Sequence, residues 1–130
     1  MGLGNSSAGR VSNLEYTILE KGHHLVVNFR GVMSERTNHV INECQKEINS
    51  RNTADKFVIL NFDSVVSLDD EVVGSIRGLQ SAIRRRPAQI RVCCIRPEWK
   101  KIFSENDIFL KDEFGEGLES TIENISRINQ

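Results

Sequence analysis

Three consecutive acidic residues, Asp69, Asp70 and Glu71, form the group in this sequence whose chemistry is most informative. They follow a continuous apolar run at residues 57–60, which is typical of a strand buried on both faces. After them, apolar residues recur at helical spacing. These residues are Val72, Val73, Ile76, Leu79 and Ile83. We therefore expect the acids to lie in a short turn between a buried strand and an amphipathic helix, where α/β proteins commonly bind ligands or partners.

Two interpretations of the acidic residues remain open from their positions. Asp69 can accept hydrogen bonds from the first free amides of the helix. Asp70 and Glu71 would then favour the positive end of the helix by about 0.3–1 kcal/mol each. Helix capping alone would explain three acids here, whereas a functional interpretation assigns them to a binding surface.

Two serines near the acids are further candidates for this surface. Ser67 lies in the predicted loop before the helix, and Ser75 lies inside the helix. Ser67 is the better placed of the two for modification by a kinase, although serine is also common in exposed loops with no special role. Ser75 would have to unfold locally to reach a kinase.

The sequence does not favour catalysis or the binding of a cofactor, a metal ion, nucleic acid or a membrane. We recognise no nucleophile–base pair, phosphate-binding glycine loop, cofactor motif or set of metal ligands, so we expect neither an enzyme nor a cofactor or metal. Seventeen basic and eighteen acidic residues give a net charge of −1, which does not favour nucleic acid or a membrane surface. The basic residues Arg84 to Arg86 are expected to form a solvated helix end.

The cysteines and the termini indicate a cytoplasmic protein. Cys44, Cys93 and Cys94 are odd in number and suit small core residues in a reducing compartment. As neighbours on a strand, Cys93 and Cys94 are expected to point to opposite faces. The sequence has no secretory signal and no apolar run long enough to cross a membrane. Residues 1–12 are rich in Gly and Ser and are expected to form a flexible tail, with one domain at 13–130.

The order of the predicted elements is ββαβαβαβα, which indicates an α/β fold with a mainly parallel sheet. Strands at 14–19 and 24–29 form an N-terminal hairpin that Gly31 ends, and a helix follows from a cap at Ser34 to about residue 50. The central strand is followed by a helix at about 70–85 and a break at Pro87. A strand at 89–95, a helix at 97–105, a short strand or extended segment at 108–110 and a last helix from about 117 complete the chain, giving about four helices in all. Residues expected to be buried in the sheet include Leu25, Val27, Val58, Leu60, Val92 and Cys94.

The centre of the chain resembles a STAS domain, the family of anti-sigma-factor antagonists and related regulatory modules. Residues 60–63, LNFD, correspond to the strand end that typically reads L-D-L-S, and Val65 corresponds to the valine that follows. Residues 68–72, LDDEV, correspond to the M-D-S-S-G-like turn that opens a helix. The phosphorylatable Ser or Thr of the family then falls on Asp70, which a serine/threonine kinase cannot phosphorylate and which already carries a negative charge.

The resemblance implies a non-catalytic, regulatory protein-binding module in a partner-switching pathway. The implied partner is an anti-sigma factor, a serine kinase-like protein or another switch protein, bound through Ser67, Asp69, Asp70, Glu71 and Ser75. Asp70 either mimics the phosphate in part or contacts the partner directly. One alternative is a structural STAS subunit of a transporter or of a multi-protein signalling complex. Another is an α/β enzyme or ligand-binding domain that uses a pocket near the same turn.

Overall fold

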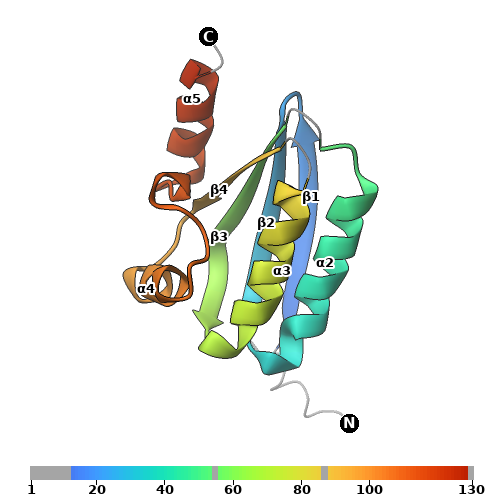
Figure 1. Ribbon diagram of the computed structural model, residues 1–130, viewed down its shortest axis with the longest axis vertical. Helices are drawn as coiled ribbons and strands as arrows, with labels where there is room; N and C mark the ends of the chain where they lie inside the picture. Colours follow the sequence, from blue (N-terminus) through green and yellow to red (C-terminus); the bar gives the residue numbers. More distant parts are fainter. Residues whose placement is uncertain (1–12, 54–55, 86–87, 129–130) are drawn as a thin grey trace.

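A mixed four-stranded sheet forms the centre of the computed structural model, which describes residues 13–53, 56–85 and 88–128 (Figure 1). Strands β1 (Leu14–Lys21) and β2 (His24–Met33) form an antiparallel hairpin. Strands β3 (Phe57–Leu68) and β4 (Gln89–Cys93) continue the sheet in parallel, in the order β1-β2-β3-β4. The predicted α/β class, with its hairpin and mainly parallel sheet, is confirmed. The expected tail at 1–12 and the break at Pro87 lie outside the described residues.

Two helices lie side by side on one face of the sheet (Figure 1). The first, α2 (Asn38–Ser50), begins after a 3-10 turn η1 (Glu35–Thr37). The second, α3 (Val73–Arg84), begins after a 3-10 turn η2 (Asp70–Val72). The strands β2 and β3 are parallel, and each is followed by one of these helices. Both helices therefore start at the same end of the sheet, beside the C-terminal ends of β2 and β3.

The C-terminal part of the chain contains α4 (Pro97–Glu105), the 3-10 turn η3 (Lys111–Glu113) and α5 (Leu118–Ile128). The described residues thus contain four α-helices, as the sequence indicates. None of the described helices is both long and apolar enough to cross a membrane.

Side chains pack into two separate cores on the two faces of the sheet. The main core lies under α2, α3 and α4 and contains the alternate β3 residues Val58 and Leu60. A smaller core on the other face joins Phe57 and Ile59 of the same strand to Ile125 of α5. Because both faces of β3 are covered here, the run at residues 57–60 is fully apolar. Of the residues expected to be buried, all except Cys94 have 0–1% of their surface exposed.

A pair of asparagines joins the two central strands beyond this apolar run. Asn28 of β2 lies directly opposite Asn61 of β3. Asn61 Nδ2 donates a hydrogen bond of 2.7 Å to Asn28 Oδ1, and the pair is partly buried.

The strands β2 and β3 are longer than the sequence indicates. The short loop predicted between the central strand and the helix, which was to include Ser67, is wrong, because β3 continues through Leu68. Val65 and Leu68 remain buried, while Asp63, Ser64, Val66 and Ser67 are exposed, so the stretch looks like a loop in the sequence. Gly31 does not end β2 but lies inside it, with φ +120° at an irregularity in the pairing. An added Cβ at Gly31 would come within 2.2 Å of the Asn13 carbonyl oxygen, so only glycine fits.

Two predictions for the C-terminal half are also wrong. The strand expected at residues 108–110 is absent, because Asp107 and Phe109 adopt left-handed backbone conformations, with φ of 55° and 62°. The strand β4 ends at Cys93, and Cys94 is left-handed, with φ 64°. Cys94 is therefore only partly buried, and its side chain packs on the same small core as Cys93 rather than on the opposite face.

Candidate functional site

Asp69 caps the helix that follows β3. Its Oδ1 atom accepts a hydrogen bond of 3.0 Å from the backbone N–H of Glu71. Its own backbone N–H donates to the Met33 carbonyl at 3.1 Å, which ties the turn to the end of β2. The predicted capping role of Asp69 is confirmed.

The carboxylates around this cap repel one another. Asp70 and Glu71 lie in the first turn after Asp69, and all three side chains are exposed. Glu35, at the start of the neighbouring helix, adds a fourth carboxylate. Repulsion by Glu35, and then by Asp69, raises the pKa of Glu71 above its ordinary value. We call the four residues Glu35, Asp69, Asp70 and Glu71 the acidic rim.

A polar contact joins the two helix starts beneath the acidic rim. Ser75 Oγ donates a hydrogen bond of 2.8 Å to Asn38 Oδ1, in the first turn of α2. Asn38 Nδ2 reaches the Glu71 carbonyl at 3.5 Å. The Ser75 hydroxyl is half-buried and engaged in this contact, so its position favours a structural role beneath the rim.

Ser67 lies in β3 rather than in the expected loop. Its partner across the parallel pair is Val32 of β2, and its side chain is exposed. The structure therefore brings Asp69, Asp70, Glu71 and Ser75 together at the helix start. Ser67 lies two residues before this group, at the end of a strand.

Glu35 and Asn38 are the site residues that sequence reasoning missed. Both lie at the start of the first helix, far from residue 70 in sequence. A signal was nevertheless available, because parallel neighbouring strands that are each followed by a helix must bring their helix starts together. The turn η1 is held by Thr37, whose Oγ1 accepts from the Ser34 N–H at 2.9 Å and donates to the Val32 carbonyl at 2.9 Å.

The arrangement suits recognition of hydrogen-bond donors and positive charge. Four exposed carboxylates on two adjoining helix starts offer acceptor oxygens. Among the described residues, no group of three or more His, Cys, Asp or Glu side chains could hold a metal ion.

Comparison with known proteins gives a consistent result for sequence and fold. A family model described as STAS domain matches residues 15–124. A search of curated proteins finds no match. The structure is similar to that of the anti-sigma factor antagonist SpoIIAA in its unphosphorylated form, with a TM-score of 0.66 and 17% identity. That alignment covers 88% of this chain and 96% of SpoIIAA.

Two other solved structures show how widely this fold occurs. An anti-sigma factor antagonist from Mycobacterium paratuberculosis aligns with a TM-score of 0.66 and 10% identity, over 87% of this chain and 94% of that one. The murine anion transporter Slc26a9 aligns with a TM-score of 0.70 and 11% identity. The alignment covers 84% of this chain but only 18% of the transporter. At these identities the likeness concerns the fold.

Proposed function

Since this chain belongs to the STAS domain family, we propose that it is a non-catalytic, cytoplasmic regulatory module that binds a switch protein through the acidic rim. The partner is an anti-sigma factor, a serine kinase-like protein or a related switch protein, with a basic side chain opposite Asp70. The chain supplies a surface and no reacting group. The correspondence of residues 68–72 to the turn of the family supports Asp70 as the phosphoacceptor-equivalent position, where an aspartate would make the negative charge permanent.

This proposal rests on the observation that Asp69, and not Asp70, caps the helix. Asp69 already makes the capping hydrogen bond, at 3.0 Å to the Glu71 N–H. Capping therefore does not require Asp70, which only adds to the repulsion, due mainly to Glu35 and then to Asp69, that raises the pKa of Glu71. A basic partner would relieve this repulsion, which supports a binding role for Asp70.

The test compares Asp70→Asn and Asp70→Ser with the wild type in titration calorimetry against the partner purified from the native cell. Both changes should weaken binding by about 1–3 kcal/mol, because each removes a charge-assisted contact. Asp63→Asn is the matched control, since Asp63 is an exposed aspartate on β3 outside the rim. Its affinity should equal that of the wild type.

Two results would contradict the proposed contact. Stronger binding by Asp70→Ser would indicate that Asp70 instead imitates a repelling phosphate. Equal affinities for all the variants would leave only helix stabilisation for Asp70.

A separate experiment tests the position of the phosphoacceptor. Phosphate mapped by mass spectrometry to Ser67 after incubation with a kinase would mean that the acceptor has moved along the chain.

A second candidate function is that of a structural STAS subunit, and the likeness to the Slc26a9 fold favours it. In that case the absence of a hydroxyl at position 70 would be natural, because no phosphate switch is needed. Recovery of the chain in a stable complex with a transporter, unaffected by Asp70→Asn, would support this function over partner switching.

A further inference from the structure

Strand β1 lies at one edge of the sheet and, among the residues that the structure describes, pairs only with β2 (Figure 1). The pairing runs without a shift in register along all 8 residues of β1. Alternate residues of an edge strand turn their backbone N–H and C=O groups away from the sheet, where these groups can pair with a further strand. Glu15, Thr17 and residues 19–21 are exposed, so a further strand has access to this edge.

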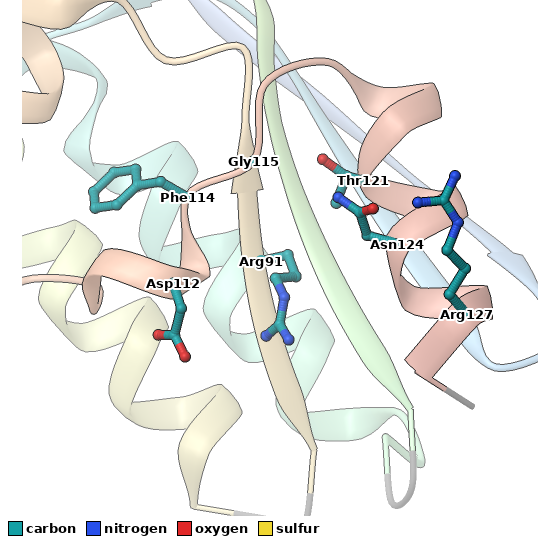
Figure 2. Close-up of a pocket in the computed structure, with 7 residues that line it drawn as sticks. All are labelled: Arg91, Asp112, Phe114, Gly115, Thr121, Asn124 and Arg127. Carbon is teal, nitrogen blue, oxygen red and sulfur yellow. The ribbon is translucent and has the colours of Figure 1, made fainter. Parts of the chain in front are cut away.

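The opposite edge of the sheet, at β4, is covered by a later segment of the chain. Gly115 N–H donates to the Val92 carbonyl at 2.7 Å, and Phe114 forms a parallel bridge with Val92. Just beyond β4, Cys94 N–H donates to the Glu116 carbonyl at 2.7 Å. Figure 2 shows Phe114 and Gly115 beside the end of β4, with α5 close by. The chain therefore limits further pairing at β4, and no described segment does the same at β1.

The side chains of β1 alternate between a covered and an open face of the sheet. Three of them pack on the main core, namely Leu14, Tyr16 and Ile18. The residues between and after them point to the other face, and Leu19 there has 56% of its surface exposed. The small core on that face contains no residue of β1. The open face of β1 thus presents an apolar side chain beside a backbone edge.

The order of residues in β1 is complementary to itself in one antiparallel register. When two identical edge strands pair about a two-fold axis, the two sheets become continuous and residues of the same face lie opposite each other. With Ile18 on the axis, Glu15 of each copy lies opposite Lys21 of the other copy, so opposite charges meet at both ends of the interface. Thr17 then lies opposite Leu19, whose exposed side chain gains a neighbour. Both kinds of cross-strand pair are favourable.

The neighbouring registers lack this match of charges. With Thr17 on the axis, Glu15 lies opposite Leu19. With Leu19 on the axis, Lys21 lies opposite Thr17. An axis between two residues would place core-facing side chains opposite exposed ones. Charged residues on an edge strand usually oppose association, but the order of the charges here favours a single self-pairing.

The register centred on Ile18 also brings no like charges together. Tyr16 lies opposite Glu20, whose charge is already balanced by Lys56 Nζ at 2.8 Å. Glu15 is paired with Arg30 of β2 on its other side, so it would lie between two cations. The whole of β1 can therefore enter the pairing without repulsion.

We propose that the edge of β1 is an interface for a second copy of this chain, which pairs antiparallel about Ile18 and joins the two sheets into one. Backbone hydrogen bonds supply the attraction, while the pairs of Glu15 with Lys21 select the partner and the register. Because each acidic rim follows the C-terminal ends of β2 and β3, the rims of the two copies lie at opposite ends of the joined sheet. The interface is separate from the acidic rim and does not depend on the function proposed for it.

Sedimentation equilibrium of the full chain, from micromolar to millimolar concentration, tests the association. The mass should rise with concentration from 14.7 kDa toward twice that value. Glu15→Lys and Lys21→Glu should each weaken self-association by about tenfold or more, because each places like charges opposite one another at both ends of the interface. Both side chains are exposed, so these substitutions leave the fold intact. Lys101→Glu makes the same change of charge on the exposed side of α4 and should alter self-association by less than about twofold.

A mixing experiment tests the register. The Glu15→Lys variant has lysine at both charged positions, whereas the Lys21→Glu variant has glutamate at both. An equimolar mixture of the two should therefore associate at least as strongly as the wild type, although each variant alone associates poorly. The double variant Glu15→Lys/Lys21→Glu exchanges the two charges and should associate like the wild type.

Several outcomes would overturn the proposal. One is a monomeric mass for the wild type at every concentration. Another is a dimer that neither single variant weakens, or a mixture that fails to associate, since either would place the contact on a different surface or in a different register. Slow hydrogen exchange at the outward-facing amides of β1 in a monomeric sample would mean that another segment of the chain covers the edge.

Discussion

Asp69 and Asp70 are adjacent and identical in type, yet their surroundings differ. Asp69 caps the helix through the Glu71 N–H, whereas Asp70 is exposed in the turn that follows. The sequence predicts the cap correctly, because an acid before an apolar helical stripe has few other roles. It cannot predict the repulsion from Glu35, because that contact joins two helix starts that are far apart along the chain.

The acidic rim makes a pH-dependent prediction for Glu71. Its raised pKa means that the folded state disfavours the ionised carboxylate, so stability falls as pH rises from the ordinary carboxyl range through the raised value. Glu71→Gln should therefore raise Tm near neutral pH, and this gain should vanish in acid, where the carboxylates are protonated.

The matched control is Glu98→Gln, which removes an exposed acid from the first turn of α4. This change should leave Tm unchanged or lower it slightly, because it removes a favourable charge from a helix start. A fall in Tm for both variants at neutral pH would contradict the repulsion inferred at the rim.

At the scale of elements, long helices are easier to predict from the sequence than short strands. Helices and their order are predicted well, because their apolar stripes repeat over several turns. The short strand expected at 108–110 fails, because its apolar residues serve a helix end instead. The Asp107 and Ile108 amides donate to the Ser104 and Phe103 carbonyls at 3.2 and 2.9 Å, which closes α4 in a Schellman motif.

This helix end carries Asp107 where glycine is preferred, and that leads to a prediction. Asp107 has φ 55°, a conformation that is unfavourable for a residue with a Cβ. Asp107→Gly should raise the free energy of unfolding by about 0.5–1 kcal/mol, and Asp107→Ala should lower it by a similar amount. Urea unfolding of the wild type and the two variants measures the order of their free energies of unfolding. Equal stabilities for the Gly and Ala variants would show that the backbone there is unstrained.

A hydrogen bond from a phenol links the hairpin to the first helix, and this contact gives another prediction. Tyr16 on β1 donates a hydrogen bond of 2.9 Å to Glu47 Oε1 on α2. Burial, and then this carboxylate, raises the pKa of Tyr16 from 10.0 to about 12. The contribution of the phenol to the free energy of unfolding is therefore complete at pH values below the pKa of tyrosine in the unfolded chain. This contribution is lost as the pH rises through about 12.

Because Tyr16 is the only tyrosine, its ionisation is directly visible in the ultraviolet absorbance. The titration should be displaced upward in the folded protein, and Glu47→Gln should bring it part of the way back. Tyr16→Phe should cost about 1 kcal/mol of unfolding free energy at neutral pH. An ordinary tyrosine titration in the folded wild type would exclude this attachment.

At the scale of the whole molecule, the element order determines which residues can meet. The fold class follows from the sequence because the strands and helices alternate, and the STAS domain match agrees with it. The packing of α5 on the second face could not be predicted in the same way. A single amphipathic helix does not reveal which face of the sheet it covers, and its core contains only a few residues.

The two cores should therefore respond differently to a buried charge. Leu60→Asp places a carboxylate in the main core and should unfold the domain, since the cost exceeds its stability of roughly 5–15 kcal/mol. Ile125→Asp places the same group in the small core and should release α5 while the rest stays folded.

Trp99 distinguishes these results, because it is the only tryptophan and lies buried in the main core. Its fluorescence should change to that of an unfolded chain in Leu60→Asp and stay native in Ile125→Asp. Circular dichroism should show the loss of about one helix in Ile125→Asp. Complete unfolding of both variants would mean that the two cores form one cooperative unit.

The asparagine pair between β2 and β3 has a consequence for how the chain finds its alignment. The four apolar residues at 57–60 fit a core on either face, so sliding β3 by one position would still bury apolar side chains. Hydrophobicity alone therefore distinguishes poorly between neighbouring registers along this run. Asn28 and Asn61 can form their hydrogen bond of 2.7 Å in only one of these registers. A slip by one position would break this bond and leave both half-buried side-chain amides without it. Two polar side chains that add little to stability can thus select the native register from its nearest competitor.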